Sequence, residues 1–315
     1  MNAIPETMQA WTIRGYGGPE AMRLERLAVP QPRAGELLVR VEAASVNPID
    51  WKMREGLLRA VFTPVFPRVL GRDCCGTVVA AGEGCAGFAP GDRVLAVSDP
   101  ARDGTHAEFA AVPCAQAARV PAQMPAEQAA CLGVAGLSAY IPIVEVAAVR
   151  AGQRVLVHAG AGGVGGLAIQ IARHLDAEVL ATCGGANLEY CKSLGAQRAI
   201  DYARERFESV ARECDAVLDT LGGEVHRRSF EVLKPGGLLV YLAATPVDPH
   251  PPRADVRVVR ADIRATTARL AKLLEWAAAG VVRAQVGASL PLARAPEAYA
   301  LSATGHARGK IVLTD

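Results

Sequence analysis

Residues 154–166 read Arg-Val-Leu-Val-His-Ala-Gly-Ala-Gly-Gly-Val-Gly-Gly, and this stretch decides the fold of a chain of 315 residues. Its apolar beginning predicts a strand, and the residues Gly163–His174 predict a helix. Between them, Gly160, Gly162 and Gly165 have the spacing GxGxxG. Glycine is needed because the turn is tight, because a Cβ atom would hold the backbone away from a pyrophosphate, and because the third glycine lets helix and strand pack closely. The stretch predicts a dinucleotide-binding turn.

Strands alternate with helices after this turn. Strands are expected at Arg154–His158, Glu178–Cys183, Ala199–Asp201, Ala216–Asp219 and Leu238–Ala243, and helices at Gly163–His174, Asn187–Leu194, Glu205–Arg212 and Gly223–Leu233. Strands about 20 residues apart with helices between them predict right-handed βαβ units in a doubly wound parallel sheet. The phosphates of a dinucleotide would lie on the N–H groups that open the first helix, near Gly163 and Val164.

The first third of the chain has a different pattern. Short apolar runs separated by Gly, Pro and Asp predict strands at Leu37–Ala43, Thr77–Ala81, Arg93–Val97 and Glu108–Val112. Many short strands with frequent turns suggest a small barrel or sandwich, which ends near Pro121–Pro125. A late helix, Asp262–Ala279, is expected from the apolar spacing of Leu270, Leu273 and Leu274, and a last strand from Lys310–Leu313.

Composition excludes several classes of partner. The formal net charge is +2, and the chain has no Lys/Arg block, so it lacks the electrostatic footprint of a nucleic-acid or anionic-membrane binder. The longest apolar run, Leu132–Val149, contains Ser138, Pro142 and Glu145, which favours a buried helix pair over a membrane span. The start of the chain does not resemble a signal peptide, so we expect a cytoplasmic protein with free thiols.

The end of the second expected strand bears on cofactor choice. Cys183 is followed by Gly184, Gly185, Ala186 and Asn187, where an NAD-binding protein would place an acidic residue for the ribose hydroxyls. A carboxylate would repel a 2′-phosphate, whereas small and amide side chains leave room for it. The absence of a carboxylate here favours NADP(H) over NAD(H), although no arginine stands at the strand end.

Eight short motifs occur in an order that resembles a known family. They are Ser45–Asp50, Leu70–Val78, Gly87–Val94, Ala135–Tyr140, the glycine turn, Leu218–Gly223, Leu233–Gly237 and Gly309–Leu313. Nearly the whole chain is similar to the medium-chain dehydrogenase/reductase superfamily, in its zinc-independent quinone oxidoreductase branch, the group of zeta-crystallin. The resemblance implies an α/β fold, with a GroES-like β-barrel domain over residues 1–122 and 284–315 and a Rossmann NADP(H)-binding domain over residues 123–283. It also implies a homodimer.

Departures from the zinc-dependent relatives bear on the chemistry. The segments that hold the metal in those enzymes read Asn47–Asp50 and Gly71–Asp73 here, so the cysteine is missing and Arg72 replaces the histidine. None of the eight cysteines forms a CxxC pair or a tight cluster, so we expect no metal site. Without a Lewis acid an alcohol is hard to oxidise, whereas a quinone or enone is already electrophilic.

The resemblance points to four catalytic candidates. Asn47 matches a family residue beside nicotinamide and substrate, and its alternative role is that of a turn residue before a proline. Trp51 stands where relatives often have tyrosine and would form an apolar wall for a flat substrate. Asp50 is a polar contact or proton route, or else part of a surface helix. Arg72 either acts in catalysis or forms an ion pair with Asp73 in the former metal position.

The resemblance also extends the cofactor site. Ser138 matches a hydroxyl near the nicotinamide, with bonding to its own helix backbone as the alternative. Asn187 and Tyr202 would approach the 2′-phosphate, and Asn187 is also a candidate helix N-cap. Leu221 and Ala243, at the ends of later strands, would approach the ribose and nicotinamide through their backbone.

These observations favour an NADPH-dependent oxidoreductase that reduces a quinone or an α,β-unsaturated carbonyl compound. One alternative is a 2-enoyl thioester reductase of the same superfamily, which would need a long or basic entrance for an acyl carrier. The other is a non-catalytic NADPH-binding or sensing protein, and the absence of a tyrosine at Trp51 keeps that interpretation open.

Overall fold

The computed structural model describes residues 3–60, 63–242, 247 and 250–315. The chain divides into two compact units. The first unit contains residues 1–134, 265–278 and 284–315, and the second contains residues 135–264 and 279–283. The first unit is rich in β-strands and the second alternates strands with helices, and the end of the chain belongs to the first unit.

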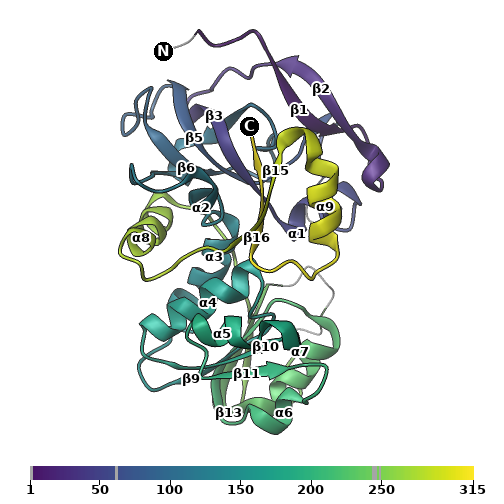
Figure 1. The fold of residues 1–315 in the computed structure, drawn as a ribbon, viewed down its shortest axis with the longest axis vertical. Helices are drawn as coiled ribbons and strands as arrows, with labels where there is room; N and C mark the ends of the chain where they lie inside the picture. Colours follow the sequence, from purple (N-terminus) through teal and green to yellow (C-terminus); the bar gives the residue numbers. More distant parts are fainter. Residues whose placement is uncertain (1–2, 61–62, 243–246, 248–249) are drawn as a thin grey trace. The chain divides into compact units, whose positions relative to one another are not determined.

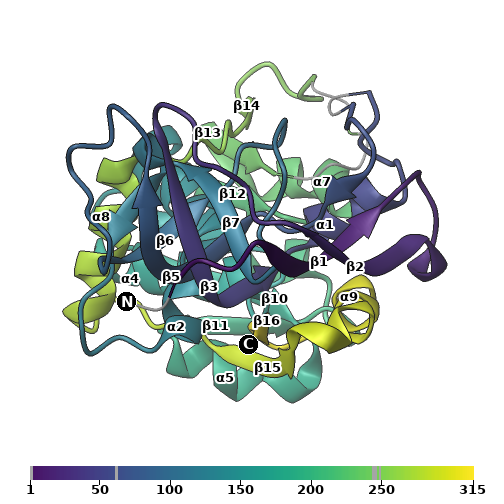
Figure 2. The ribbon, with the colours of Figure 1, turned by 90° about the horizontal axis from the view of Figure 1, so that it is seen from above.

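The first unit is built on two sheets (Figure 2). The larger sheet has the order β15 (Val286–Pro291), β16 (Lys310–Thr314), β3 (Glu36–Val46), β5 (Asp73–Ala81), β6 (Arg93–Val97) and β8 (Ala117–Arg119), with β7 (Phe109–Pro113) paired to β3. The smaller sheet joins β2 (Met22–Ala28), β1 (Thr7–Ile13) and β4 (Arg68–Val69). All pairs except β15 with β16 are antiparallel, as the barrel prediction requires.

The last strand of the chain completes the larger sheet. β16 runs antiparallel to β3, with Ile311 opposite Val46 and Leu313 opposite Ala44 (Figure 1). Its residues from Lys310 to Leu313 are buried. This register brings Lys310 to the end of β3, where helix α1 (Pro48–Arg54) begins.

The second unit is the predicted parallel sheet. Its strand order is β11 (Arg198–Asp201), β10 (Glu178–Cys183), β9 (Arg154–Val157), β12 (Cys214–Asp219), β13 (Leu233–Tyr241) and β14 (Arg257–Arg260). All five strand pairs are parallel. α4 (Gly163–His174), α5 (Leu188–Ser193), α6 (Phe207–Val210) and α7 (Gly223–Ser229) connect the strands. α4 and β10 begin and end at the residues that the sequence predicts, because a glycine turn and clear apolar runs mark their limits.

Two helices of the second unit are shorter than the sequence predicts. The helix expected over Glu205–Arg212 ends at Val210, because the extended backbone of Ala211 leads the chain toward β12. The helix expected to reach Leu233 ends at Ser229 and is followed by one 3₁₀ turn. Leu233 instead begins β13, because it pairs in parallel with Cys214 of β12.

The compact units also differ from the expected domain limits. Residues 123–134 and α8 (Thr267–Ala278), which the expected domain 123–283 includes, belong to the first unit. Leu270, Leu273 and Leu274 form the buried side of α8, and the Thr267 hydroxyl donates to the carbonyl oxygen of Cys114 at 3.4 Å. α8 therefore belongs to the first unit, on which its buried side packs.

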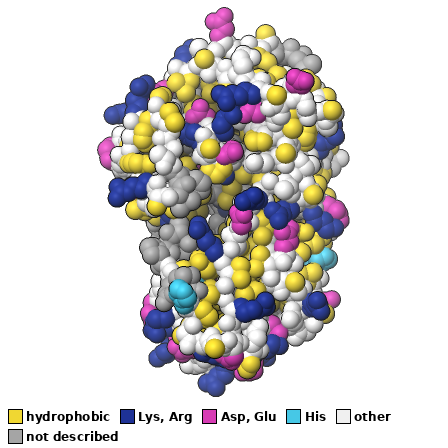
Figure 3. Space-filling view, turned by 180° about the vertical axis from the view of Figure 1, so that it is seen from behind, with side chains coloured by type: hydrophobic (Ala, Val, Ile, Leu, Met, Phe, Trp, Pro, Cys, Tyr) yellow, Lys and Arg dark blue, Asp and Glu magenta, His cyan; other side chains and the backbone are white. Residues whose placement is uncertain are grey.

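The surface agrees with the charge analysis. On the face drawn in Figure 3, Lys and Arg side chains are interspersed with Asp and Glu and do not form one basic patch. In the part of the chain that the structure describes, no helix has the length and apolar character needed to cross a bilayer. The apolar run Leu132–Val149 instead contains α3 (Val134–Tyr140) and a π-helix, Ile141–Val146, with largely buried side chains.

Candidate active site

A buried polar network lies where β3 ends and α1 begins. The Asp73 side chain is fully buried, and its Oδ1 accepts hydrogen bonds from the Ser45 hydroxyl at 2.7 Å and from Asn47 Nδ2 at 2.9 Å. Its Oδ2 accepts the backbone N–H of Val134 at 2.6 Å. Burial raises the pKa of Asp73, while the positive charge of Lys310 and these hydrogen bonds oppose the rise. Asp73 is thus a fully engaged carboxylate that holds other side chains in place.

Lys310 fixes the orientation of the Asn47 amide. Its Nζ donates to Asn47 Oδ1 at 2.6 Å and to the carbonyl oxygen of Val46 at 2.7 Å. Because an ammonium group only donates, Asn47 must direct its oxygen toward Lys310 and its Nδ2 toward Asp73. The Asn47 amide is therefore fully engaged and positions its neighbours. The sequence analysis did not select Lys310, although a lysine beside an apolar strand is a recognisable signal.

Asp50 differs from Asp73 because half of its carboxyl group is free. Its Oδ2 accepts the backbone N–H of Asn47 at 2.7 Å, whereas Oδ1 is buried and has no hydrogen-bond partner among the described residues. Burial raises the pKa of Asp50 from 3.8 to about 7, and the nearby charge of Asp73 adds to this rise. The surface-helix alternative does not hold, because the Asp50 side chain is only 1% exposed.

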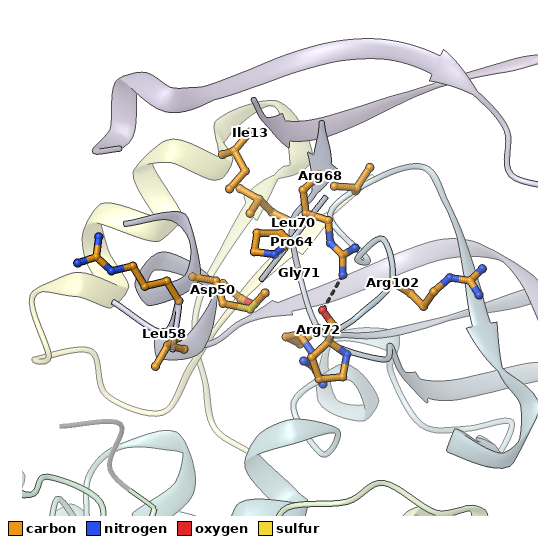
Figure 4. Close-up of a pocket in the computed structure, with 13 residues that line it drawn as sticks. Ile13, Asp50, Leu58, Pro64, Arg68, Leu70, Gly71, Arg72 and Arg102 are labelled. Atoms are coloured by element: carbon orange, nitrogen blue, oxygen red, sulfur yellow. Dashed lines mark hydrogen bonds between the residues drawn. The ribbon is translucent and has the colours of Figure 1, made fainter. Parts of the chain in front are cut away.

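Asp50 and Arg72 line the same pocket in the first unit (Figure 4). The pocket is partly open to solvent, and apart from Asp50 and four arginines its lining is apolar. Asp50 comes from α1, and Arg72 comes from the segment between β4 and β5. Nε and Nη1 of Arg72 are buried without a hydrogen-bond partner in the described ranges. Gly71 allows this segment to pass His106, because a Cβ atom there would lie 2.5 Å from the imidazole Cδ2.

The ion pair between Arg72 and Asp73 that the sequence suggested is not formed. The Asp73 carboxylate is occupied by Ser45, Asn47 and the Val134 N–H, so it needs no guanidinium. Arg72 lines the pocket instead. Burial lowers the pKa of its guanidinium, and the charges of Asp50 and Asp73 partly oppose this effect.

Trp51 is placed differently from Asp50. Its ring is partly buried against the core cluster that includes Trp11, Ile13 and Val46, and it is not among the residues that line the pocket. Lys52 Nζ lies 5.4 Å from the centre of this ring. The predicted role of Trp51 as an apolar wall for the substrate stays a prediction.

His106 and Tyr299 form a second buried pair, which supports the C-terminal end of β3. His106 Nε2 lies 3.3 Å from the carbonyl oxygen of Ser45, and His106 Nδ1 lies 2.9 Å from the Tyr299 hydroxyl. Because a carbonyl only accepts, Nε2 carries the proton and Nδ1 accepts from Tyr299. Burial lowers the pKa of His106 to about 4, so the ring is neutral. The sequence analysis selected neither residue, because Tyr299 lies 193 positions away from His106.

The two cysteines that follow Asp73 are part of the core of the first unit. Cys74 and Cys75 are fully buried within β5. Burial raises the pKa of Cys75 to about 12 and that of Cys74 well above its ordinary value. Neither thiol is activated as a nucleophile.

The glycine turn of the second unit has the geometry of a phosphate-binding cradle. A Cβ atom at Gly165 would lie 2.2 Å from the Ala159 carbonyl oxygen, and one at Gly160 would lie 2.8 Å from the Ala181 Cβ. Both glycines are therefore required by close packing of turn, helix and strand. Gly162 precedes α4 as its N-cap, and the half-buried Gly163 and Val164 begin the helix. These residues fit the diphosphate of a dinucleotide at a helix N-terminus.

The end of β10 carries the candidates for the adenosine side of the cofactor. Cys183 is buried, and Gly184 and Asn187 are partly exposed. Tyr202 is 59% exposed, and its hydroxyl would lie 3.5 Å from a Cβ atom at Gly184, so these two residues are brought together. Asn187 occupies the N-cap position of α5 without a side-chain capping hydrogen bond. The sequence analysis missed Asp201, whose Oδ2 would lie 2.6 Å from a Cβ atom at Gly185.

Three further cofactor candidates have different outcomes. Ser138 is buried on α3, and its predicted place near the nicotinamide stays a prediction. Leu221 follows β12 with an exposed side chain, and its N–H donates to Asp219 Oδ1 at 2.8 Å. Ala243 lies outside the described residues.

The donor set does not fit a catalytic zinc ion. Among the described residues, no group of three or more His, Cys, Asp or Glu side chains is arranged to hold a metal. The segments around Asn47 and Arg72 offer an amide and a guanidinium, which are not zinc ligands.

Comparison with known proteins identifies the class. Residues 33–122 match the alcohol dehydrogenase GroES-like domain, and residues 194–313 match the zinc-binding dehydrogenase family. A 2-methylene-furan-3-one reductase of Solanum lycopersicum is 34% identical over 99% of this chain and 80% of its own length. The NADPH-dependent alkenal/one oxidoreductase of Arabidopsis thaliana chloroplasts is 33% identical with the same coverage. The quinone oxidoreductase structure from Coxiella burnetii is 30% identical, with a TM-score of 0.88 over 98% of this chain and 99% of that one.

The two units and their sites thus define an oxidoreductase with a GroES-like and a Rossmann-type domain. The chain belongs to the medium-chain dehydrogenase/reductase superfamily, as a quinone oxidoreductase-like member. The predicted family and fold class are confirmed.

Proposed function

We propose that the protein is an NADPH-dependent reductase of quinones or α,β-unsaturated carbonyl compounds that works without zinc. The observation that carries this proposal is the free, buried carboxyl oxygen of Asp50 in a pocket that also contains Arg72. The relatives named for alkenal/one and quinone reduction support the substrate class.

Asp50 has the properties of a proton donor. NADPH supplies a hydride when bound, and the reduced substrate must then take up a proton. Because Asp50 Oδ2 accepts the N–H of Asn47, a proton on this carboxyl group sits on Oδ1, the oxygen without a partner. A pKa of about 7 allows the group to hold the proton near neutral pH and still release it readily.

The other residues position the donor and the substrate. Lys310 and Asp73 lock the Asn47 amide, so the backbone N–H of Asn47 holds Asp50 in one orientation. Arg72 binds the substrate through its free guanidinium N–H groups. The apolar part of the lining, including Leu58 and Leu70, excludes water from the reacting atoms.

NADP(H) is the proposed cofactor. No acidic residue follows Cys183 at the end of β10, and Tyr202 lies beside Gly184. The Asp201 carboxylate lies near Gly185 at the same edge of the sheet, and the guanidinium of Arg204, 3.7 Å from it, offsets its negative charge. These features favour a 2′-phosphate, and the name of the Arabidopsis relative supports the same preference.

The test is an assay of purified protein for metal content and for cofactor oxidation with a quinone, an enone and an alcohol paired with NADP⁺. We expect turnover of the quinone or the enone, and a kcat/KM at least about tenfold higher with NADPH than with NADH, as one phosphate-binding interaction provides. Stoichiometric zinc with alcohol oxidation would overturn the proposal. Tight NADPH binding without turnover of any acceptor would favour a non-catalytic binding protein.

A further inference from the structure

The pocket of the first unit is lined by more cationic than anionic side chains. Its charged lining residues are Arg59, Arg68, Arg72, Arg102 and Asp50. Figure 4 shows that Arg68 and Arg72 come from neighbouring positions on one side of the pocket, while Asp50 comes from α1. Asp50 is the single carboxyl group of this described lining, and its raised pKa leaves it partly neutral near pH 7.

Two of these four cations already have partners, and a third, Arg59, is exposed to solvent. The two Nη atoms of Arg68 donate to the carbonyl oxygens of Pro100 and Ala101, at 2.7 Å and 3.0 Å. Arg102 forms an ion pair with Glu36 at 2.7 Å. Neither guanidinium needs a ligand.

Arg72 differs from Arg59 because part of its guanidinium is buried. Two of its nitrogen atoms are buried and make no hydrogen bond with the described residues, although Asp50 and Asp73 are close enough to affect its pKa. Buried N–H groups without a hydrogen-bond acceptor are costly, because they have lost their hydration and gained no partner in exchange. A neutral carbonyl would supply a hydrogen-bond acceptor but no charge, whereas a carboxylate supplies both.

The apolar walls of the pocket add a second requirement. Ile13, Met53, Leu58 and Leu70 line it together with Arg72. A ligand that satisfies this surface has an apolar body and one anionic end. A phosphate or a free inorganic anion would leave the apolar part of the pocket unfilled.

We propose that the substrate is an acidic enone or quinone, in which a carboxylate on an apolar chain binds to Arg72. This inference rests on the proposed reductase function and names the substrate class of the same site. Arg72 is then a specificity-determining residue, and Asp50 remains the proton donor. The carboxylate takes no part in the reaction.

The test uses matched pairs of enones. One member ends in a carboxylate that several saturated carbons separate from the conjugated system, and the other ends in the corresponding primary amide, so the reacting atoms are the same. We expect kcat/KM to be about 10- to 100-fold higher for the acid, the range of a charge-assisted hydrogen bond. In Arg72→Gln this ratio should fall to near one. The matched control Arg26→Gln, at an exposed arginine of β2 outside the pocket, should retain it.

A binding measurement separates this inference from the proposed function. Calorimetry with the saturated analogues of the same acid and amide reports recognition of the carboxylate without any turnover. Preferential binding of the saturated acid, lost in Arg72→Gln, supports the inference even if no acceptor is reduced. Reduction of both enones at equal kcat/KM would overturn the inference and leave the reductase function intact. An acid preference that persists in Arg72→Gln would also overturn it.

Discussion

Replacement of Asp50 with asparagine should make the protein more stable and less active. Asp50 is 1% exposed, and burial raises the pKa of its carboxyl group from 3.8 to about 7. The charged groups around it are Asp73, which raises this pKa, and Lys310 and Arg72, which lower it. Asparagine has the shape of the protonated side chain and never ionises. The variant therefore removes the cost of holding a buried negative charge at neutral and alkaline pH.

The magnitude follows from the difference between the two pKa values. Between pH 3.8 and about 7 the folded protein retains the Asp50 proton while the unfolded chain has released it, so the free energy of unfolding falls as pH rises. Each pKa unit is worth about 1.4 kcal/mol, which gives a total of about 4 kcal/mol above pH 7. The stability gain of Asp50→Asn should thus be about 2–3 kcal/mol larger at pH 8 than at pH 5. Any cost of packing the amide is the same at both pH values and cancels from this difference.

Urea unfolding at pH 5 and pH 8, followed by circular dichroism, measures the effect. The control Asp176→Asn makes the same change at an exposed carboxylate, whose closest approach to Arg173 is 3.8 Å. That variant should show no comparable dependence on pH, since exposed ion pairs contribute little. Reductase activity of Asp50→Asn should fall because the proton donor is lost. An equal stability change at pH 5 and pH 8 would refute the account of Asp50 as a buried group that holds its proton.

Two further predictions concern the cofactor turn and the buried lysine. Gly165→Ala should abolish NADPH binding, measured by fluorescence titration, because its Cβ would collide with the backbone at 2.2 Å, while Gly87→Ala, with no atom within 4 Å, should bind normally. Lys310→Met should lower stability by about 3–5 kcal/mol in thermal unfolding, because it leaves the buried Asp73 without its balancing charge. Unchanged stability of that variant would contradict the structural role of Lys310.

Local sequence signals predicted the second unit better than the first. The glycine turn, α4 and β10 follow from residues that are close together in the chain, so the predicted and observed limits coincide. β1 and β2 were not predicted, although they form a continuous antiparallel pair from Thr7 to Ala28. In β1, buried and exposed residues do not alternate regularly, so a search for alternating apolar and polar residues does not detect this strand.

The polar network shows why a site is harder to predict than a fold. Asn47 and Asp50 are close in sequence, and both were selected from the motif that contains them. Lys310 is 263 positions from Asn47 and reaches it only because β16 pairs with β3 in the register that places Ile311 opposite Val46. Local sequence patterns do not reveal the register between two strands that lie so far apart in the chain. The contact between His106 and Tyr299, which are 193 positions apart, was missed for the same reason.

Arg72 shows a different limit. The motif comparison correctly noticed an arginine in place of a metal ligand, and charge alone suggested that the adjacent Asp73 neutralises it. That inference was wrong because Ser45, Asn47 and the backbone N–H of Val134 already occupy the Asp73 carboxylate. Among the described residues, Nε and Nη1 of Arg72 thus have no hydrogen-bond partner, and the proposed acidic substrate would supply one.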